Sequence, residues 1–383
     1  MLKIVKTPWY SYSTGKIPKG CELCVQGKKM VLFITGICVQ KCFYCPISEK
    51  KYGCDVVFAN EFKIKDAKNP IEMFEESKLT EAEGAGITGG DPLINVERCC
   101  NYIKRLKKSY GTNFHIHLYT PLKLVSDEKL KKLYEAGLDE IRFHPNLDDE
   151  SLWRRIELAS KYDWDIGIEI PVIPGYEKKI KKMIDFVSGK VQFINLNELE
   201  LSDTSSKHYK LSDMGFKTKN KNSYAVKGSE ELGKKILEYT SKKSLNGHLC
   251  TAKLKDSIQV TRRLTIRAKN MALPFDTKTE DGTLIRGCVY LKELTPCFSY
   301  REVLKKIDKN DFVKKLLKIK EELIKKLSVS KEDIVVDKVK FRLLMPSKLV
   351  QKNSSKIKKR GLVPAIVEET PTEDSLEIEV EFV

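Results

Sequence analysis

The sequence predicts an α/β protein, a partial (β/α)6 barrel followed by a smaller C-terminal α+β domain. Two observations favour this fold class. From about residue 30 to 200, short apolar segments alternate with amphipathic segments, a pattern typical of parallel strands joined by right-handed helical crossovers. Within most of the short segments every second residue is polar, whereas strands of an ordinary parallel sheet are apolar on both faces.

The expected elements follow this alternation. Strands are predicted at residues 30–36, 84–88, 113–119, 138–144, 165–172 and 191–197. The helices between them are predicted at residues 69–79, 95–111, 127–137, 149–162 and 177–189. Two of these helices end at Gly111 and Gly137, since glycine commonly ends a helix.

After residue 200 the alternation weakens. Residues 202–224 are polar and predict a loop, followed by a helix, a short strand and a long basic helix at residues 229–243, 247–252 and 253–272. Strands at residues 283–294, 337–346 and 375–383 surround an amphipathic helix at 311–327. We expect four parts: an N-terminal extension (1–27), the partial barrel (28–245), a helical connection (246–280) and the α+β domain (281–383).

The polar positions of neighbouring strands form one set. Because successive side chains of a strand point to opposite faces, these residues share one face of the sheet. A barrel interior lined in this way holds water and a substrate, whereas a closed eight-stranded barrel fills its interior with branched apolar side chains. A sheet that exposes this face to solvent is the alternative. The set comprises His115, His117, Tyr119, Arg142, His144, Gly167, Glu169, Asn195 and Asn197.

The charge is basic and unevenly distributed. The formal net charge is +17, and residues 301–360 carry 20 Lys and Arg against 8 Asp and Glu, while residues 361–383 carry 7 acidic residues and no basic ones. A basic face followed by an acidic tail suits an RNA surface or a solvated exterior. The abundance of both Lys and Glu is typical of heat-adapted proteins and needs no nucleic acid to explain it.

The cysteine content indicates metal or redox chemistry. The chain has 11 cysteines and begins without the apolar stretch and cleavage site of a signal peptide, so a disulfide framework is not expected. The apolar run at residues 30–39 is too short to cross a bilayer. We therefore expect a cytoplasmic protein that keeps its thiols reduced under anaerobic conditions and has no membrane partner.

Three cysteines, Cys38, Cys42 and Cys45, are spaced Cys-x3-Cys-x2-Cys on a loop that leaves the first predicted strand. Three thiolates can hold three irons of a [4Fe–4S] cluster. The fourth iron then has no protein ligand, and an open coordination position distinguishes a catalytic metal site from a structural one. A zinc loop completed by a distant cysteine is the alternative.

With Tyr44 and the segment ITGGDPL at residues 87–93, these cysteines resemble the radical S-adenosylmethionine (radical SAM) superfamily. The resemblance implies a radical SAM type of barrel in which the methionine end of S-adenosylmethionine chelates the open iron. It implies that one electron from the reduced cluster splits the sulfonium and that the resulting 5′-deoxyadenosyl radical abstracts hydrogen from a substrate. A one-electron donor such as ferredoxin or flavodoxin is implied as a partner.

The resemblance also implies the cofactor-binding residues. Tyr44 precedes the last cysteine, and Gly89 and Gly90 lack side chains, so their backbone can approach the cofactor closely. Asp91 stands where the superfamily often has glutamate. The remaining candidates are polar barrel residues, of which the Arg142 guanidinium suits a carboxylate. They are held as one set: Arg142, His144, Glu169, Asn195 and Asn197.

The stretch from Pro18 to Gly53 is similar to an archaeal group related to the pyruvate formate-lyase activating enzyme. That similarity implies an oxidoreductase or transferase reaction and leaves the substrate open between a protein or peptide, RNA and a small metabolite. The basic helix at residues 253–272 motivates RNA. An iron–sulfur electron-transfer protein is the non-enzyme alternative, and it requires a fully ligated cluster.

A second metal site is a further hypothesis. Cys21 and Cys24 form a Cys-x2-Cys pair, and His248 and Cys250 lie two residues apart in a predicted strand and so share a face. Together these four side chains could hold zinc or part of a second iron–sulfur cluster. Unmetalled thiols are the alternative, and Cys54, Cys288 and Cys297 are other candidates for a second cluster. We expect His115 and His117 to form hydrogen bonds inside the barrel.

Overall fold

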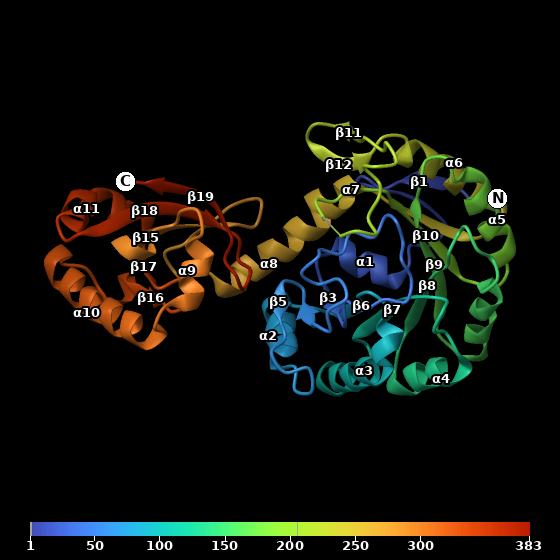
Figure 1. The fold of residues 1–383 in the computed structure, drawn as a ribbon, viewed down its shortest axis with the longest axis horizontal. Coiled ribbons are helices and arrows are strands. Elements are labelled where there is room, and N and C mark those ends of the chain that lie inside the picture. Colours follow the sequence, from blue (N-terminus) through green and yellow to red (C-terminus); the bar gives the residue numbers. More distant parts are fainter. Residues whose placement is uncertain (1, 205) are drawn as a thin grey trace. The chain divides into compact units, whose positions relative to one another are not determined.

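The computed structural model describes residues 2–204 and 206–383. The chain divides into two compact units, Met1–Arg262 and Arg263–Val383. Both appear in Figure 1, in which the first unit runs from blue to yellow and the second is orange and red. Each unit has its own apolar cores. The finer division at residues 27, 245 and 280 stays a prediction.

The first unit is built on a parallel sheet, as predicted. Its parallel strands lie in the order β13-β10-β9-β8-β7-β6-β3 (Figure 1). Their bounds are Lys29–Phe33 (β3), Gly84–Thr88 (β6), His115–Pro121 (β7), Glu140–His144 (β8), Asp165–Val172 (β9), Phe193–Glu198 (β10) and Asn246–Cys250 (β13). Strand β13 therefore extends the six predicted parallel strands by one. The α/β barrel-like fold is confirmed.

Short antiparallel strands border this sheet on both sides. Strand β2 (Tyr12–Thr14) pairs with β13 and with β1 (Ile4–Lys6). At the other edge, β4 (Phe58–Ala59) pairs with β3 and with β5 (Phe62–Lys63). The N-terminal residues thus belong to the sheet of the first unit.

Helices pack on the apolar side of the sheet. They are α2 (Ile71–Leu79), α3 (Val96–Tyr110), α4 (Asp127–Ala136), α5 (Glu177–Val187) and α6 (Ser229–Lys242). The strand residues that face them are fully buried, among them Ile116, Ile141, Ile168 and Ile194. This burial confirms the predicted alternation, because the strand residues between them, which point to the opposite face of the sheet, are the polar residues of the predicted set.

The helix predicted at residues 149–162 is instead a 3-10 helix, η2 (Trp153–Lys161). Its buried residues are Trp153, Ile156 and Ala159, three positions apart. A 3-10 helix has three residues per turn, so this spacing places all of them on one side. The three-residue spacing of the apolar side chains therefore fits a 3-10 helix better than the predicted α-helix.

Helix α1 (Lys19–Val25) covers the polar side of the sheet and contacts β3, β6 and β7. A Cβ at Gly20 would lie 2.4 Å from Nδ1 of His117 and 2.7 Å from Nη2 of Arg142. Only a glycine allows the helix to approach these side chains so closely. The polar face is therefore buried beneath α1, and His117 and Arg142 are each 1% exposed.

The segment predicted as a loop contains a hairpin of β11 (Thr218–Asn220) and β12 (Ser223–Val226). The long basic helix also departs from expectation, because a π-helical stretch, η3 (Lys255–Val260), lies between α7 (Ala252–Leu254) and α8 (Thr261–Met271). Short π-helical insertions often occur at functional sites.

The second unit is an antiparallel sheet with helices, which agrees with the predicted α+β class. Its strands lie in the order β16-β17-β15-β18-β19, and β14 pairs with β15. The bounds are Thr277–Lys278 (β14), Leu284–Leu291 (β15), Val335–Asp337 (β16), Arg342–Met345 (β17), Leu362–Glu369 (β18) and Glu377–Phe382 (β19). The helices are Tyr300–Lys306 (α9), Lys309–Leu327 (α10) and Ser347–Lys358 (α11).

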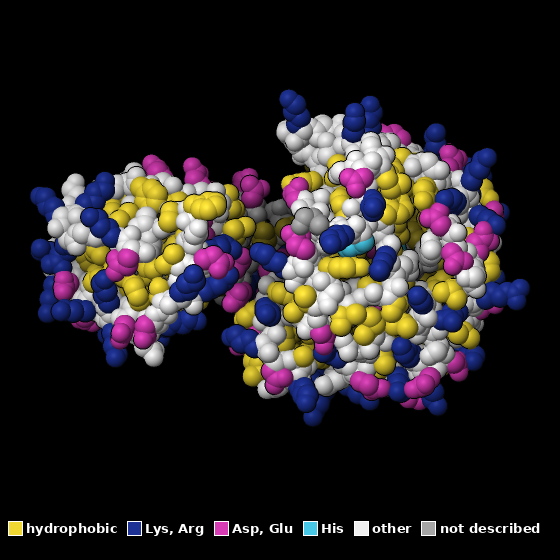
Figure 2. Space-filling view, viewed as in Figure 1, with side chains coloured by type: hydrophobic (Ala, Val, Ile, Leu, Met, Phe, Trp, Pro, Cys, Tyr) yellow, Lys and Arg dark blue, Asp and Glu magenta, His cyan; other side chains and the backbone are white. Residues whose placement is uncertain are grey.

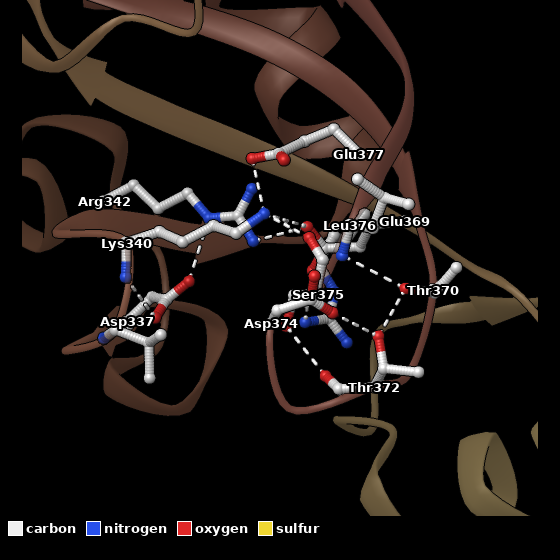
Figure 3. A network of polar contacts seen from close by, with 12 residues as sticks. Asp337, Lys340, Arg342, Glu369, Thr370, Thr372, Asp374, Ser375, Leu376 and Glu377 are labelled. Carbon is white, nitrogen blue, oxygen red and sulfur yellow. Dashed lines mark hydrogen bonds and ion pairs between the residues drawn. The ribbon is translucent and has the colours of Figure 1, made fainter. Parts of the chain in front are cut away.

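A buried ion-pair network joins the strands of this second unit, as Figure 3 shows. The Arg342 guanidinium donates to Asp337 (2.9 Å) and to Glu369 (2.6 Å). Lys340, between β16 and β17, pairs with Glu377 on β19, the opposite edge strand of the sheet. Because Arg342 is fully buried, removing both of its carboxylate partners would leave a charge without compensation.

The surface mixes charges of both signs. On the face shown in Figure 2, Lys and Arg side chains lie interspersed with Asp and Glu side chains in both units. Among the described helices, none combines the length and the apolar character that a bilayer crossing requires.

Candidate functional site

The three cysteines lie on a loop between β3 and β4 that folds back on itself. The Gly36 amide donates to the Cys54 carbonyl (2.8 Å), and the Gly53 amide donates to the Gly36 carbonyl (2.9 Å). A Cβ at Gly36 would lie 1.6 Å from the Lys51 carbonyl oxygen. Glycine at this position is therefore a condition for closing the loop.

All three cysteines line one cavity of about 390 Å³. The cavity also includes six of the nine predicted cofactor-binding residues, which are Tyr44, Gly89, Gly90, His144, Glu169 and Asn197. The structure thus gathers, at one place, cysteines from the loop and residues from β8, β9, β10 and the turn after β6. Thiols beside a hydrogen-bonding wall are the side chains that an iron–sulfur cluster with an organic cofactor next to it would require.

The remaining three predicted residues do not line this cavity. Asp91 caps the short helix η1 (Pro92–Asn95), accepting from the Leu93 amide (3.0 Å) and from the Thr120 hydroxyl (2.9 Å). Arg142 and Asn195 line a second, adjoining cavity. All three side chains are buried.

Gly89 and Gly90 pack against the cysteine loop. The Gly90 amide donates to the Thr35 carbonyl (2.7 Å). A Cβ at Gly90 would lie 2.3 Å from the Ile37 carbonyl oxygen, and one at Gly89 would lie 2.4 Å from the Thr35 carbonyl oxygen. The absence of side chains at these two positions therefore lets the cysteine loop rest on the end of β6.

Burial raises the pKa of each loop thiol. The pKa of Cys38 is about 11 and that of Cys42 about 12, because desolvation disfavours the thiolate. Burial also raises the pKa of Cys45. A metal must therefore displace protons from these sulfurs, so metal binding is coupled to their deprotonation.

Tyr44 connects the cysteine loop to the barrel strands. Its hydroxyl lies 2.8 Å from Nε2 of His144, whose Nδ1 lies 2.8 Å from the Glu169 carbonyl oxygen. A carbonyl only accepts, so Nδ1 carries the proton and Nε2 accepts from the Tyr44 hydroxyl. Burial lowers the pKa of His144, which agrees with a neutral ring.

Arg142 lies at the centre of a buried polar network. Its guanidinium pairs with Glu140 and donates from Nη1 to Glu169 (2.7 Å) and to the Tyr119 hydroxyl (3.3 Å). The second oxygen of Glu169 accepts from the Asn197 amide (2.9 Å). Glu169 is therefore part of the wall of both cavities, and both of its oxygens are already hydrogen-bonded, one of them to a buried cation.

A second cavity, of about 760 Å³, adjoins the first. The two cavities share Tyr44, Pro46, Tyr119, His144, Glu169 and Asn197. Lys255 and Gln259 from η3 also line the second cavity. A substrate in the larger cavity would lie next to a cofactor in the smaller one.

The residues of the predicted second metal site meet only in part. Cys21, Cys24 and Cys250 line the larger cavity. Both ring nitrogens of His248 are hydrogen-bonded, Nδ1 to Asn195 (2.8 Å) and Nε2 to Ser11 (3.2 Å). Metal binding by these four residues stays a prediction, and it would require His248 to give up one of these bonds.

The remaining cysteines and histidines have separate places. Cys54 and Cys297 are exposed, and Cys288 is buried in the second unit. His115 contacts Lys29, with 2.7 Å between Nδ1 and Nζ, and Nε2 of His117 lies 2.9 Å from the Tyr119 hydroxyl. The two histidines thus form hydrogen bonds, as predicted.

Several residues that line the two cavities were not identified as candidates from the sequence. Phe33, Gln40 and Thr88 line the smaller cavity, and Lys255 and Gln259 line the larger one. Gln40 lies between Cys38 and Cys42 in the sequence, which was a usable signal. Lys255 and Gln259 gave none, because their orientation depends on the π-helical stretch.

Comparison with known proteins identifies the family. A family model described as "Radical SAM superfamily" matches residues 32–187. A protein of Methanocaldococcus jannaschii named "Putative glycyl-radical enzyme activating enzyme MJ0021" is 43% identical over 311 residues, covering 77% of this chain and 81% of that protein. The matched family region contains the cysteine loop and both glycines.

Solved structures with partial similarity include HydG, a maturase of the [FeFe]-hydrogenase, at 13% identity, 66% coverage of this chain, 65% of that chain and a TM-score of 0.38. They also include the radical S-adenosylmethionine methyltransferase TsrM of Kitasatospora setae, at 12% identity and a TM-score of 0.36. The match covers 52% of this chain and 42% of TsrM, so it spans less than half the length of TsrM. Similarity at these scores supports no conclusion about the reaction. From the family model and the Methanocaldococcus relative, the chain belongs to the radical SAM superfamily and is an enzyme that uses a [4Fe–4S] cluster and S-adenosylmethionine.

Proposed function

We propose that this protein is an activating enzyme that abstracts a hydrogen atom from a glycine of a partner protein and leaves a glycyl radical there. The observation that carries the proposal is the 43% identity to a relative named for that activity, over 77% of the chain. The cavity of about 760 Å³ beside the cysteine cavity supports it, because that volume accommodates a few residues of an inserted peptide loop.

Cys38, Cys42 and Cys45 are the proposed ligands of the cluster. Two observations support this assignment: all three cysteines line a single cavity, and three thiolates leave one iron of a [4Fe–4S] cluster without a protein ligand. When bound there, the cluster supplies the electron that splits S-adenosylmethionine. A ferredoxin or flavodoxin is the proposed source of that electron.

The six predicted residues on the wall of the smaller cavity are the proposed contacts of S-adenosylmethionine. Backbone oxygens near Gly89 and Gly90 would accept from its ammonium group, and the Tyr44 ring would separate the cofactor from solvent. Asp91, Arg142 and Asn195 do not line this cavity and are proposed to hold neighbouring side chains in place. They hydrogen-bond to Thr120, Glu169 and His248, respectively.

The substrate class is tested by tracing where the abstracted hydrogen comes from. Cells of the source organism are grown in D2O and separated into protein, RNA and metabolite fractions. Each fraction is added in H2O to the reduced, reconstituted enzyme with S-adenosylmethionine, and the deuterium content of the 5′-deoxyadenosine is measured by mass spectrometry. Exchangeable N–D, O–D and S–D groups lose their label in H2O, so only a C–D bond of the substrate transfers deuterium.

The proposal expects deuterium from the protein fraction alone, and none after that fraction is digested with protease. Transfer from the metabolite fraction would identify a small molecule, and transfer from the RNA fraction would identify an RNA. Either result contradicts the proposal. Protein labelled only at glycine then tests whether the hydrogen comes from a glycine. The Cys42→Ala variant is the control for enzymatic origin.

A further inference from the structure

Three thiols lie on the wall of the larger cavity, outside the cysteine loop. Cys21 and Cys24 come from α1, and Cys250 ends β13. Tyr119 lines both cavities, and burial raises its pKa. The thiols thus line the cavity that adjoins the proposed cofactor cavity.

The packing of α1 holds the Cys-x2-Cys pair at this wall. Gly20 rests on His117 and Arg142, and its amide donates to Oε2 of Glu140 over 3.4 Å. The Cys21 thiol is directed at Asn195, with 3.9 Å between Sγ and Oδ1. An N-terminal helix inside the barrel therefore brings two sulfurs into the space where a substrate would lie.

Two other buried cysteines of the first unit differ from these three, because they pack only in the apolar core. Cys99 and Cys100 lie on α3 within the apolar core and line neither cavity. Cys21 and Cys250 are equally buried against solvent, at 5% and 7% exposure, yet they face a cavity. A buried thiol keeps its proton, because desolvation disfavours the thiolate. The cavity wall therefore carries S–H groups.

We propose that Cys21, Cys24 and Cys250 are hydrogen-atom donors that take up the enzyme's radical when no substrate occupies the larger cavity. The inference rests on the proposed radical chemistry and adds a role for residues outside the cluster and cofactor contacts. An S–H bond is weaker than an alkyl C–H bond, so a hydrogen atom moves from sulfur to a primary carbon radical.

The sulfurs of the helix can complete this reaction without an added oxidant. Cys24 loses its hydrogen atom to the carbon radical, and its sulfur then bonds to the sulfur of Cys21, whose proton leaves to water in the open cavity. The surplus electron of the sulfur pair would pass to the oxidised cluster that Cys38, Cys42 and Cys45 would hold. Residues three apart on a helix are neighbours, which brings this pair within reach of a disulfide after a small adjustment.

The label experiment for this inference is run in D2O without substrate. Thiols exchange to S–D, whereas carbon-bound hydrogens of the protein and cofactor do not exchange. The reduced wild-type enzyme is given S-adenosylmethionine, and the fraction of 5′-deoxyadenosine that carries one deuterium is measured. This fraction does not depend on the total yield. The proposal expects most of the wild-type product to be deuterated.

The variant Cys21→Ala/Cys24→Ala/Cys250→Ala is expected to lose the deuterium label, and the Cys100→Ala variant is expected to keep it. A label that persists in the triple variant overturns the proposal and points to the exchangeable hydroxyl of Tyr119. An unlabelled wild-type product also overturns it, while leaving the radical chemistry intact. If no 5′-deoxyadenosine forms at all, the proposed function fails and this inference fails with it.

A second measurement needs no variant and therefore does not depend on folding of the triple variant. After substrate-free turnover, the wild-type protein is alkylated under denaturing conditions and its peptides are mapped. The expected result is a Cys21–Cys24 disulfide that increases with the 5′-deoxyadenosine formed. Fully alkylated Cys21 and Cys24 after many turnovers would contradict the proposal.

Discussion

The Tyr44 hydroxyl donates to Nε2 of His144 over 2.8 Å and thereby joins the cysteine loop to the end of β8. His144 is itself fixed by its Nδ1 contact with the Glu169 carbonyl on β9. The loop that bears the proposed cluster ligands is thus aligned with the barrel by a chain of two hydrogen bonds. The edge-on contact of the two rings, 5.8 Å between centroids, adds to this alignment.

The Tyr44→Phe variant tests this connection. It removes one buried hydrogen bond and leaves Nε2 of His144 without a donor, so we expect a loss of about 1–3 kcal/mol in the free energy of unfolding. Urea denaturation of the apoprotein measures it. Tyr176→Phe is the matched control, because its hydroxyl bonds to the exposed Asp148 (3.2 Å). Equal stabilities of the two variants would contradict the structural role of Tyr44.

The Gly90→Ala variant tests the packing of the cysteine loop on β6. The new methyl group would collide with the Ile37 carbonyl oxygen, 2.3 Å away, so we expect the loop to shift and iron incorporation to fall. The measurement is iron per chain after anaerobic reconstitution. Gly175→Ala is the control, since Gly175 has a φ of +91° and open space around it. That control carries a backbone penalty of about 1–2 kcal/mol and should keep its iron.

The Glu169→Gln variant tests the link between the two cavities. Glutamine retains the acceptor for Asn197 but withdraws a charge from the buried Arg142. Glu140 remains as a partner of Arg142, so we expect a moderate loss, about 1–3 kcal/mol, in the free energy of unfolding. We also expect weaker binding of S-adenosylmethionine, measured by calorimetry. The exposed Glu157→Gln change is the control, and no difference between the two variants would refute this role.

Lys29 makes the stability depend on pH. Its side chain is buried beside His115, and burial lowers its pKa to about 7, against the opposing effect of Cys24 and Glu140. Below pH 7 the amine is charged in the folded and unfolded states, and the burial penalty is present in full. Between pH 7 and 10 only the unfolded state is protonated at this lysine, so stability rises with pH.

The Lys29→Met variant isolates that contribution. The difference in unfolding free energy between wild type and variant should shift in favour of the wild type as the pH rises from 7 to 9, by up to about 1.4 kcal/mol for each pH unit. Urea denaturation at several pH values measures it. Lys28→Met, at the neighbouring half-exposed position, is the control. A difference that stays constant across this range would rule out a neutral Lys29.

Much of the barrel could be predicted because its signal is local. Ile116, Ile141 and Ile168 alternate with polar residues, and this two-residue period dictates which face each side chain takes. The loop cysteines could also be recognised from the sequence, because three candidate ligands within eight residues need no knowledge of the fold. Gly89 and Gly90 could be placed at the strand end, although their packing on Ile37 and Thr35 required the structure.

The rest depended on contacts between residues far apart in the sequence. Nothing local shows that α1 enters the barrel, because its position follows from Gly20 meeting His117 and Arg142. The joint lining of one cavity by Cys24 and Cys250 likewise follows from the sheet order and not from any motif. His248 was a plausible ligand by residue type, but its bonds to Asn195 and Ser11 could not be predicted.

The central claim is that Cys38, Cys42 and Cys45 hold a cluster that splits S-adenosylmethionine. The most direct measurement is 5′-deoxyadenosine production by the anaerobically reconstituted, dithionite-reduced protein, comparing wild type with Cys42→Ala and with Cys54→Ala, an exposed cysteine of the same loop. We predict product from the wild type and from Cys54→Ala, and none from Cys42→Ala. Wild-type amounts of product from Cys42→Ala would contradict the assignment.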